Sequence, residues 1–181
     1  MRDLGSNTSS MGKVLAVSSI LTILGTPDCA TVTPATQAKE MEHLQCDSDT
    51  SNGKDVRLVE SMIVLAVNPV YSYMHNGRTG TDRRIKGVKL LVRVPESVSS
   101  SLLLRSLQCH CARMTLGRET LASLPNDPFW LPNAWVDIES TPQGGNLEVT
   151  IATDGIDGNL RILSLAKAFA AAHAPRLSSG S

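Results

Sequence analysis

The sequence predicts an α+β fold, namely an antiparallel four-stranded sheet covered on one face by two helices, with the elements in the order ββαββα. Four segments are rich in β-branched residues or alternate between apolar and polar residues, which is typical of strands. Two longer segments repeat apolar residues every three or four positions, which is typical of helices. The last five elements match most of a ferredoxin-like unit, so the uncovered face of the sheet should be wetter.

The first two predicted strands cover residues 58–67 and 86–94. The first is rich in β-branched residues and ends at Asn68-Pro69, and the second alternates between apolar positions and Lys89 or Arg93. Between them we expect a solvated loop over residues 71–84, with turns at its glycines. This loop is basic because it contains Arg78, Arg83 and Arg84. These three arginines are candidates for binding an anion or a partner.

A helix is predicted from Pro95 to about Leu116, because proline suits a first helical turn and Gly117 is a natural stop. Its core face follows steps of three and four residues through Leu104, Leu107, Cys111 and Met114. Strands over residues 134–139 and 146–152 form the clearest hairpin, with a turn over residues 142–145. A final helix over residues 156–173 carries apolar residues on one face.

The loop over residues 118–133 places Phe129 and Trp130 between prolines. Two interpretations stay open. The rings can plug an edge of the core, which their large gain on burial favours, or they can stand exposed as a partner-binding wedge.

The chain is expected to begin with an export segment. Lys13 precedes an uncharged run over residues 14–24 that is too short for a comfortable membrane span and is broken by Gly25 and Pro27. We therefore predict a signal peptide or membrane anchor over residues 1–25, with Met11 as an alternative start, and a flexible polar tether over residues 26–55. Cys29 is a lipidation candidate, although Asp28 before it does not suit that motif. The single folded domain is placed at residues 56–175 and a polar tail at residues 176–181.

The composition limits the classes of partner. Seventeen basic and 17 acidic residues give a net charge of 0, and aromatic residues make up only 3% of the chain. No strong global field attracts nucleic acid, and platforms for stacking bases are not expected. We expect a protein or cell-envelope component as partner, contact with a membrane only through the N-terminal segment or a lipid, and a periplasmic, envelope-anchored or secreted location. The sequence leaves the oligomeric state open.

Cys109, His110 and Cys111 stand in a row on the predicted helix. At about 100° per residue their side chains fan out, so they cannot all bind one ion. Cys111 lies on the core face and is expected to be a small buried hydrophobe, whereas Cys109 should point away from that face. Cys109 is a disulfide candidate, with Cys46 or Cys29 as partner or with a second copy. A site for zinc or copper is the alternative to having no cofactor, with weak candidate ligands at His110, Cys109, Cys46 and His43.

Around Cys109-His110 and Ala112-Arg113, and from Pro128-Phe-Trp-Leu-Pro132 through the hairpin, the chain resembles hypothetical exported proteins of myxobacteria and their relatives. The resemblance covers about residues 55–170 and implies export without an assigned activity. We expect a non-enzymatic exported protein that binds a partner. The alternatives are a metal or thiol redox module around Cys109 and His110, and a small hydrolase or transferase, although no phosphate-binding loop or nucleophile elbow is present and no catalytic residue stands out.

Overall fold

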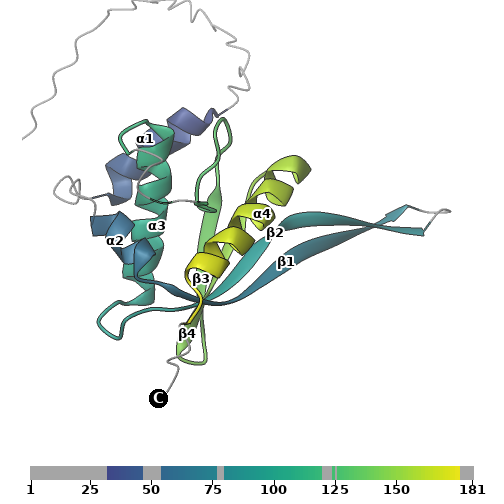
Figure 1. Ribbon diagram of the computed structural model, residues 1–181. Coiled ribbons are helices and arrows are strands. Elements are labelled where there is room, and N and C mark those ends of the chain that lie inside the picture. The colour runs from purple at the N-terminus through teal and green to yellow at the C-terminus, as the bar shows by residue number, and fades with distance from the viewer. Residues whose placement is uncertain (1–31, 47–53, 77–79, 120–123, 125, 176–181) are drawn as a thin grey trace, which may run out of the picture. The chain divides into compact units, whose positions relative to one another are not determined.

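The computed structural model describes residues 32–46, 54–76, 80–119, 124 and 126–175. Its elements are α1 (Pro34–Gln45), α2 (Lys54–Glu60), β1 (Ile63–Asn76), β2 (Gly80–Arg93), α3 (Ser100–Thr115), β3 (Asp137–Gln143), β4 (Asn146–Ala152) and α4 (Ile156–Ala172) (Figure 1). The expected succession ββαββα is therefore present, and two further helices precede it. None of the helices in these ranges is long and apolar enough to cross a membrane. The expected export segment, Cys29 and the polar tail at residues 176–181 lie outside the described residues.

The four strands form one antiparallel sheet in the order β1-β2-β4-β3. Strands β2 and β3 both run antiparallel to β4, which lies between them, so they are parallel to each other, and α3 connects them. This is the split β-α-β arrangement of ferredoxin-like folds, and here its first strand, β2, also forms a hairpin with β1. The α+β prediction is confirmed.

Both α3 and α4 pack on the same face of the sheet. Leu90 of β2 lies opposite Val149 of β4, and both side chains are fully buried. They belong to one core cluster with side chains of the two helices, among them Leu107 and Phe169. The opposite face carries polar residues, including an ion pair between Lys89 Nζ and Glu148 Oε1 at 2.6 Å. The sheet thus buries apolar residues on one face and presents charged ones on the other, as antiparallel sheets commonly do.

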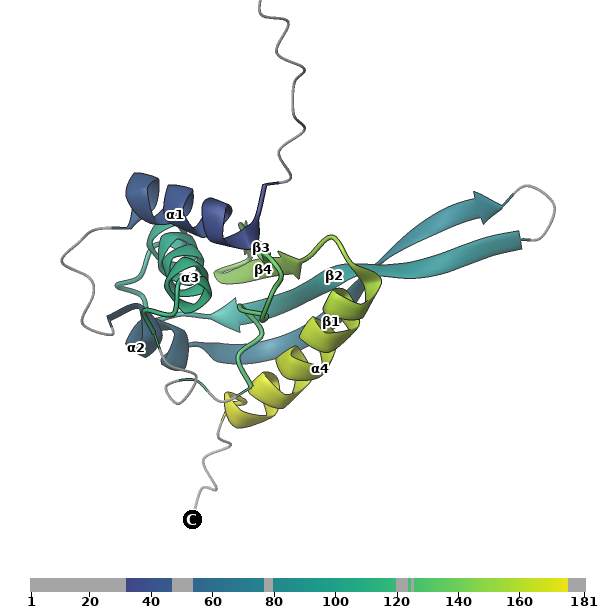
Figure 2. The same cartoon turned by 90° about the horizontal axis from the view of Figure 1, so that it is seen from above.

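The first hairpin extends well beyond the sheet and forms a projecting arm (Figures 1 and 2). Strand β4 pairs with β2 only over residues 88–92, whereas the pairing of β1 with β2 continues to Asn76 and Gly80. The predicted loop over residues 71–84 is therefore wrong for the described part of that range. Aromatic residues such as Tyr71 and Tyr73 favour strands, and side chains of the two strands contact each other across the arm. We call residues 71–76 and 80–86 the arm.

A bulge and a glycine mark the base of the arm. Val70 pairs with Gly87 and Tyr71 with Ile85, so Lys86 has no partner and forms a bulge, which bends a strand. A Cβ atom on Gly87 would lie 2.7 Å from the carbonyl oxygen of Ile151. Only glycine therefore allows β4 to approach β2 at the point where the arm leaves the sheet.

Two predicted segments near the N-terminus need correction. Residues 58–60, predicted to start a strand, belong to α2, in which Val56 and Val59 are both buried at a helical spacing of three residues. The predicted tether over residues 26–55 is wrong for Pro34–Gln45, which form α1. The hydroxyl of Thr33 caps this helix by accepting the N–H of Thr36. Residues 26–31 and 47–53 of the predicted tether lie outside the described ranges.

The remaining predicted elements are found with shifted ends. Helix α3 begins at Ser100, after the N-cap Ser99, and ends in a Schellman motif in which Gly117 has a φ of 67°. In the second hairpin, Gly144 and Gly145 both have positive φ, as a two-residue type I′ turn requires. Each edge strand contains one proline, Pro69 in β1 and Pro142 in β3.

We predict that Gly87→Ala destabilises the fold by about 2 kcal/mol or more, because the added methyl group overlaps a backbone oxygen that cannot rotate away. The control is Gly155→Ser at the N-cap of α4, where φ is −99° and a Cβ atom would meet nothing within 4 Å. Serine is a favourable N-cap residue, so the control should be as stable as the wild type. Urea denaturation of both variants measures the difference, and equal midpoints would contradict the close approach at Gly87.

Candidate functional site

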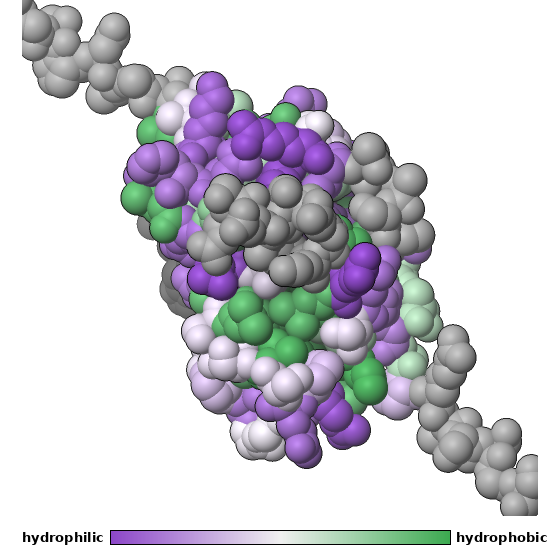
Figure 3. Space-filling model, turned by 90° about the vertical axis from the view of Figure 1, so that its left-hand side faces the viewer, coloured by the Kyte–Doolittle hydropathy of each residue, from purple (hydrophilic) through white to green (hydrophobic). Residues whose placement is uncertain are grey.

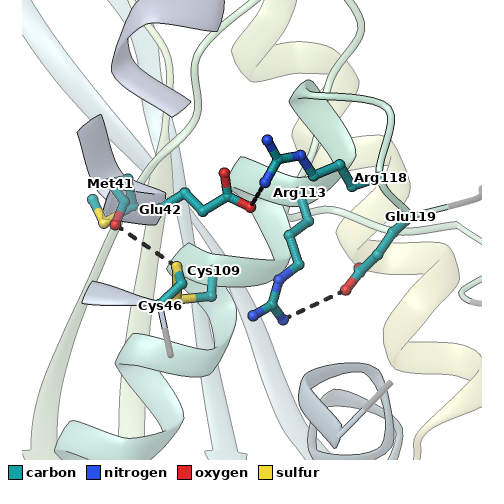
Figure 4. The surroundings of a disulfide bond; sticks show 7 residues. All are labelled: Met41, Glu42, Cys46, Cys109, Arg113, Arg118 and Glu119. Carbon is teal, nitrogen blue, oxygen red and sulfur yellow. Dashed lines mark hydrogen bonds and ion pairs between the residues drawn. A yellow bond between two sulfur atoms is a disulfide. The ribbon is translucent and has the colours of Figure 1, made fainter. Parts of the chain in front are cut away.

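A disulfide joins Cys46, just after α1, to Cys109 in α3, with their Cα atoms 5.6 Å apart (Figure 4). Of the pairings that the sequence left open, the structure shows Cys46 with Cys109. The expectation that Cys109 points away from the core face holds, but its exposure is only 3%, because α1 lies against this side of α3. The bond thus fixes a helix over a position that faces away from the sheet.

Helix α1 has few other strong attachments to the domain. Ala38 is its only buried residue. Glu42 forms an ion pair with Arg118, which follows α3, but the arginine side chain is 60% exposed, and such surface pairs contribute little. The disulfide is therefore the covalent link between α1 and α3, in addition to the packing of the two helices against each other.

Cys111 is the free cysteine of the described residues, and it is fully buried. Its thiol lies 3.8 Å from the carbonyl oxygen of Val136. Burial raises the pKa of this thiol to about 12, so it stays protonated and unreactive at neutral pH. The expectation that Cys111 is a small buried hydrophobe is confirmed.

His110 is fully buried between two carboxylates. Its Nδ1 lies 2.6 Å from Glu119 Oε2 and its Nε2 lies 2.7 Å from Asp127 Oδ2. Burial by itself lowers the pKa of an imidazole, but the hydrogen bonds and charges of Asp127 and Glu119 outweigh it and raise the pKa of His110 to about 9. The ring is therefore a buried imidazolium at neutral pH, and each ring nitrogen donates to one carboxylate.

This ionic cluster attaches the long loop after α3 to the helix. Asp127 Oδ1 also accepts the backbone N–H of Phe129 at 2.8 Å, and Arg113 of α3 lies 3.8 Å from Glu119. Neither Glu119 nor Asp127 was indicated by the sequence as a partner of His110, because they lie 9 and 17 residues after it and no spacing rule links these positions.

The four weak candidates for metal ligands do not form a site. Cys46 and Cys109 are bonded to each other, both nitrogens of His110 contact carboxylates, and His43 is exposed on α1. Within the described ranges, no group of three or more His, Cys, Asp or Glu side chains is arranged to hold a metal ion.

Phe129 and Trp130 have different environments. Phe129 is fully buried and contacts Phe169 edge-on, with ring centroids 5.7 Å apart, so the core-plug interpretation is right for it and a partner-binding role is wrong. Trp130 is partly buried and lines two hollows of about 390 Å³ each. One hollow includes Thr33 and Pro34 at the start of α1, and the other includes Arg161 of α4.

The arm presents an aromatic and cationic surface. The guanidinium carbon of Arg83 lies 3.4 Å from the ring centroid of Tyr71, and Tyr73 is 67% exposed. Tyr73 pairs with Arg83 and Tyr71 with Ile85, so Tyr71, Tyr73 and Arg83 share one face of the arm. Arg84 lies on the other face and binds Asp82 at 2.8 Å. Arg78, the third arginine singled out from the sequence, lies outside the described residues.

A groove of about 440 Å³ runs along the edge of the sheet formed by β3. Met41 of α1 and Gln108 of α3 line it together with residues 135–139, and Gln108 donates its side-chain N–H to the carbonyl oxygen of Ile138 at 3.1 Å. Trp135 donates its indole N–H to Asp137 Oδ1 at 3.0 Å. We call this hollow, with its exposed carboxylates Asp137 and Glu139, the β3 groove.

Apolar side chains also gather on the side of the molecule that lies to the left in Figure 1, as the green patch in Figure 3 shows. This side carries α1, α2 and α3. The arm projects from the opposite side (Figure 1), so the patch is a separate surface.

We predict that replacing both disulfide cysteines, Cys46→Ala with Cys109→Ala, lowers the free energy of unfolding by about 4 kcal/mol, because the bond closes a loop with a sequence separation of 63 residues. Amide exchange in α1 should rise to that of a free peptide. The control is Cys111→Ala, which keeps the bond. If α1 stays protected in the double variant, its noncovalent contacts suffice to hold it.

We predict that stability falls with rising pH because of His110. Its pKa is about 9 in the folded protein against an ordinary value of 6.5, so its contribution of about 3 kcal/mol is complete below pH 6.5 and is lost as the pH rises through 9. His110→Gln should remove this slope and destabilise the protein at pH 6, since it leaves the buried carboxylate of Asp127 without its cation and Glu119 with Arg113 alone beside it. His43→Gln, on an exposed residue, is the control. Urea melts between pH 6 and 9.5 measure the slope, and a flat wild-type profile would contradict the buried imidazolium.

Comparison with known proteins gives no assignment. No protein-family model matches the chain, and neither a curated protein nor a solved structure matches it.

Proposed function

We propose that the protein is an exported, non-enzymatic binding module that contacts its partner through the arm. The observation that carries this proposal is the surface formed by Tyr71, Tyr73 and Arg83, which stands on a hairpin that projects from the domain (Figure 2).

The composition of this surface supports a role in binding. Tyrosine and arginine are enriched among the residues that dominate the energy of protein interfaces. The stacking of Arg83 on Tyr71 restricts both side chains before a partner arrives, which reduces the entropy lost on binding. A two-stranded ribbon is also only marginally stable in water by itself, so contact with a partner would stabilise the outer arm.

The disulfide supports export. Disulfides persist in oxidising compartments and are rare where cellular thiols are kept reduced. The Cys46–Cys109 bond agrees with the signal peptide or anchor expected at residues 1–25 and with a periplasmic, envelope-anchored or secreted location. Lipidation of Cys29 remains part of this proposal as one way of anchoring the chain.

The position of His110 supports a structural role over a catalytic one. A general base needs a nitrogen free to reach a substrate, whereas both nitrogens of His110 contact carboxylates and the ring has no exposed surface. The raised pKa of His110 is explained by the cluster that holds the loop, without a substrate.

We predict that a photo-crosslinking amino acid at Tyr73 yields one discrete crosslinked product in cells of the native host, recovered outside the cytoplasm. The same probe at Lys167, which is exposed on α4, is the matched control and should yield none. Gel analysis with and without reductant, followed by mass spectrometry, identifies the product. Equal crosslinking at both positions would contradict the arm as the binding surface, and recovery from the cytoplasm would contradict export.

A further inference from the structure

We infer that the arm of one copy docks into the β3 groove of a second copy of this chain. The inference deepens the proposed function and rests on it, since it names the partner of the same surface. Three observations carry it, and they are the separation of charge along the chain, the chemistry of the groove, and the positions of the arm and the groove at opposite edges of the sheet.

The neutral chain separates its charges along the sequence, with a basic segment in the first hairpin and an acidic stretch after α3. Between Arg118 and Arg161 the sequence contains no lysine or arginine, although it carries seven acidic residues, namely Glu119, Asp127, Asp137, Glu139, Glu148, Asp154 and Asp157. The arm shows the opposite bias, because residues 71–76 and 80–86 carry Arg83, Arg84 and Lys86 against one acidic residue, Asp82. Surfaces of opposite charge on one molecule attract each other between copies.

Other contacts already neutralise part of the acidic set. Glu119 and Asp127 bind His110, and Glu148 binds Lys89. In the β3 groove, Glu139 is exposed and forms no ion pair within the described residues, and Asp137 accepts the indole N–H of Trp135. The groove thus combines two carboxylates with an aromatic ring and the thioether of Met41.

Such a groove suits an arginine from the arm. A guanidinium binds carboxylates through paired N–H donors and also packs on aromatic rings. Arg83 is exposed and stacks on Tyr71. It forms no ion pair in the described part of the chain. The neighbouring Tyr73 adds apolar area that can pack against the walls of the groove.

The geometry excludes docking within one copy. The arm extends from β1 and β2, and the groove follows β3, at the other edge of the order β1-β2-β4-β3. The arm spans about six residues per strand beyond Gly87, or about 20 Å at the usual rise of a strand, and it points away from the domain (Figure 2). Its complementary groove is therefore reached only on a second molecule, either reciprocally in a two-fold dimer or head to tail.

The test is an exchange of charges across the contact, followed by sedimentation velocity of the purified, disulfide-bonded chain. We expect the wild type to self-associate, and to do so more weakly as the salt concentration rises. Arg83→Glu and Glu139→Arg should each weaken association at least tenfold. Mixing the two variants should restore association. In each contact between one variant and the other, the side chain at position 83 of the arm then meets a side chain of opposite charge at position 139 of the groove. Lys167→Glu on α4 is the control and should associate as the wild type does.

Each other outcome overturns the inference. A wild type that stays monomeric at all attainable concentrations contradicts it, as does association that Arg83→Glu leaves unchanged or that mixing does not restore. Circular dichroism of both variants shows whether they are folded. A monomeric chain whose Tyr73 probe still crosslinks to a different protein would refute self-docking and leave the proposed function standing, whereas loss of both results would refute the two together.

Discussion

Helix α3 is the constraint on which the rest of the structure depends, because three consecutive side chains leave it in three directions and each fixes a different part of the chain. Cys111 enters the core cluster that α3 shares with the sheet. Cys109 holds α1 through the disulfide, and His110 holds the loop that follows the helix through Glu119 and Asp127. The rotation of about 100° per residue makes this possible, since adjacent side chains on a helix point in different directions.

The buried ionic cluster is sensitive to the loss of any member. Charged groups leave water at a large cost, and their mutual attraction offsets that cost only while the set is complete. Here one imidazolium faces two carboxylates, with Arg113 beside Glu119. The cluster also fixes the path of the chain toward Phe129, because Asp127 binds the backbone N–H of that residue. Asp127 therefore links His110 to the point at which Phe129 enters the core.

The sequence predicted those parts of the fold that periodicity controls. The alternation of apolar and polar residues predicted β4 and the central part of β2. Apolar residues at helical spacing, among them Leu107 and Cys111, predicted α3. In both cases burial of one face produces a regular pattern in the sequence. Periodicity in the sequence did not predict the arm or α1. The arm pairs only with itself and needs no alternating apolar face, and α1 buries a single residue, so neither leaves a periodic signal.

The candidate site was predicted only in its separate parts. Cys46 and Cys109 were predicted as disulfide candidates because cysteines can pair with each other. Arg83 and Arg84 were predicted as partner-binding candidates because they lie in a basic segment. Contacts that depend on the tertiary fold could not be predicted from the sequence. Asp127 meets His110, and Tyr71 meets Arg83, through the path of a loop and the register of a hairpin, which no local pattern specifies.

The prolines in the two edge strands limit how this sheet can grow. Proline has no N–H group to give to a neighbouring strand, and both edges carry one, Pro69 in β1 and Pro142 in β3. Continuous backbone pairing between molecules is therefore interrupted at either edge, and with it the route toward fibrillar aggregates. Assembly through side chains is by contrast reversible and responsive to ionic conditions. In a protein built in this way, molecules can meet through side chains without the sheet acting as a template for misfolding.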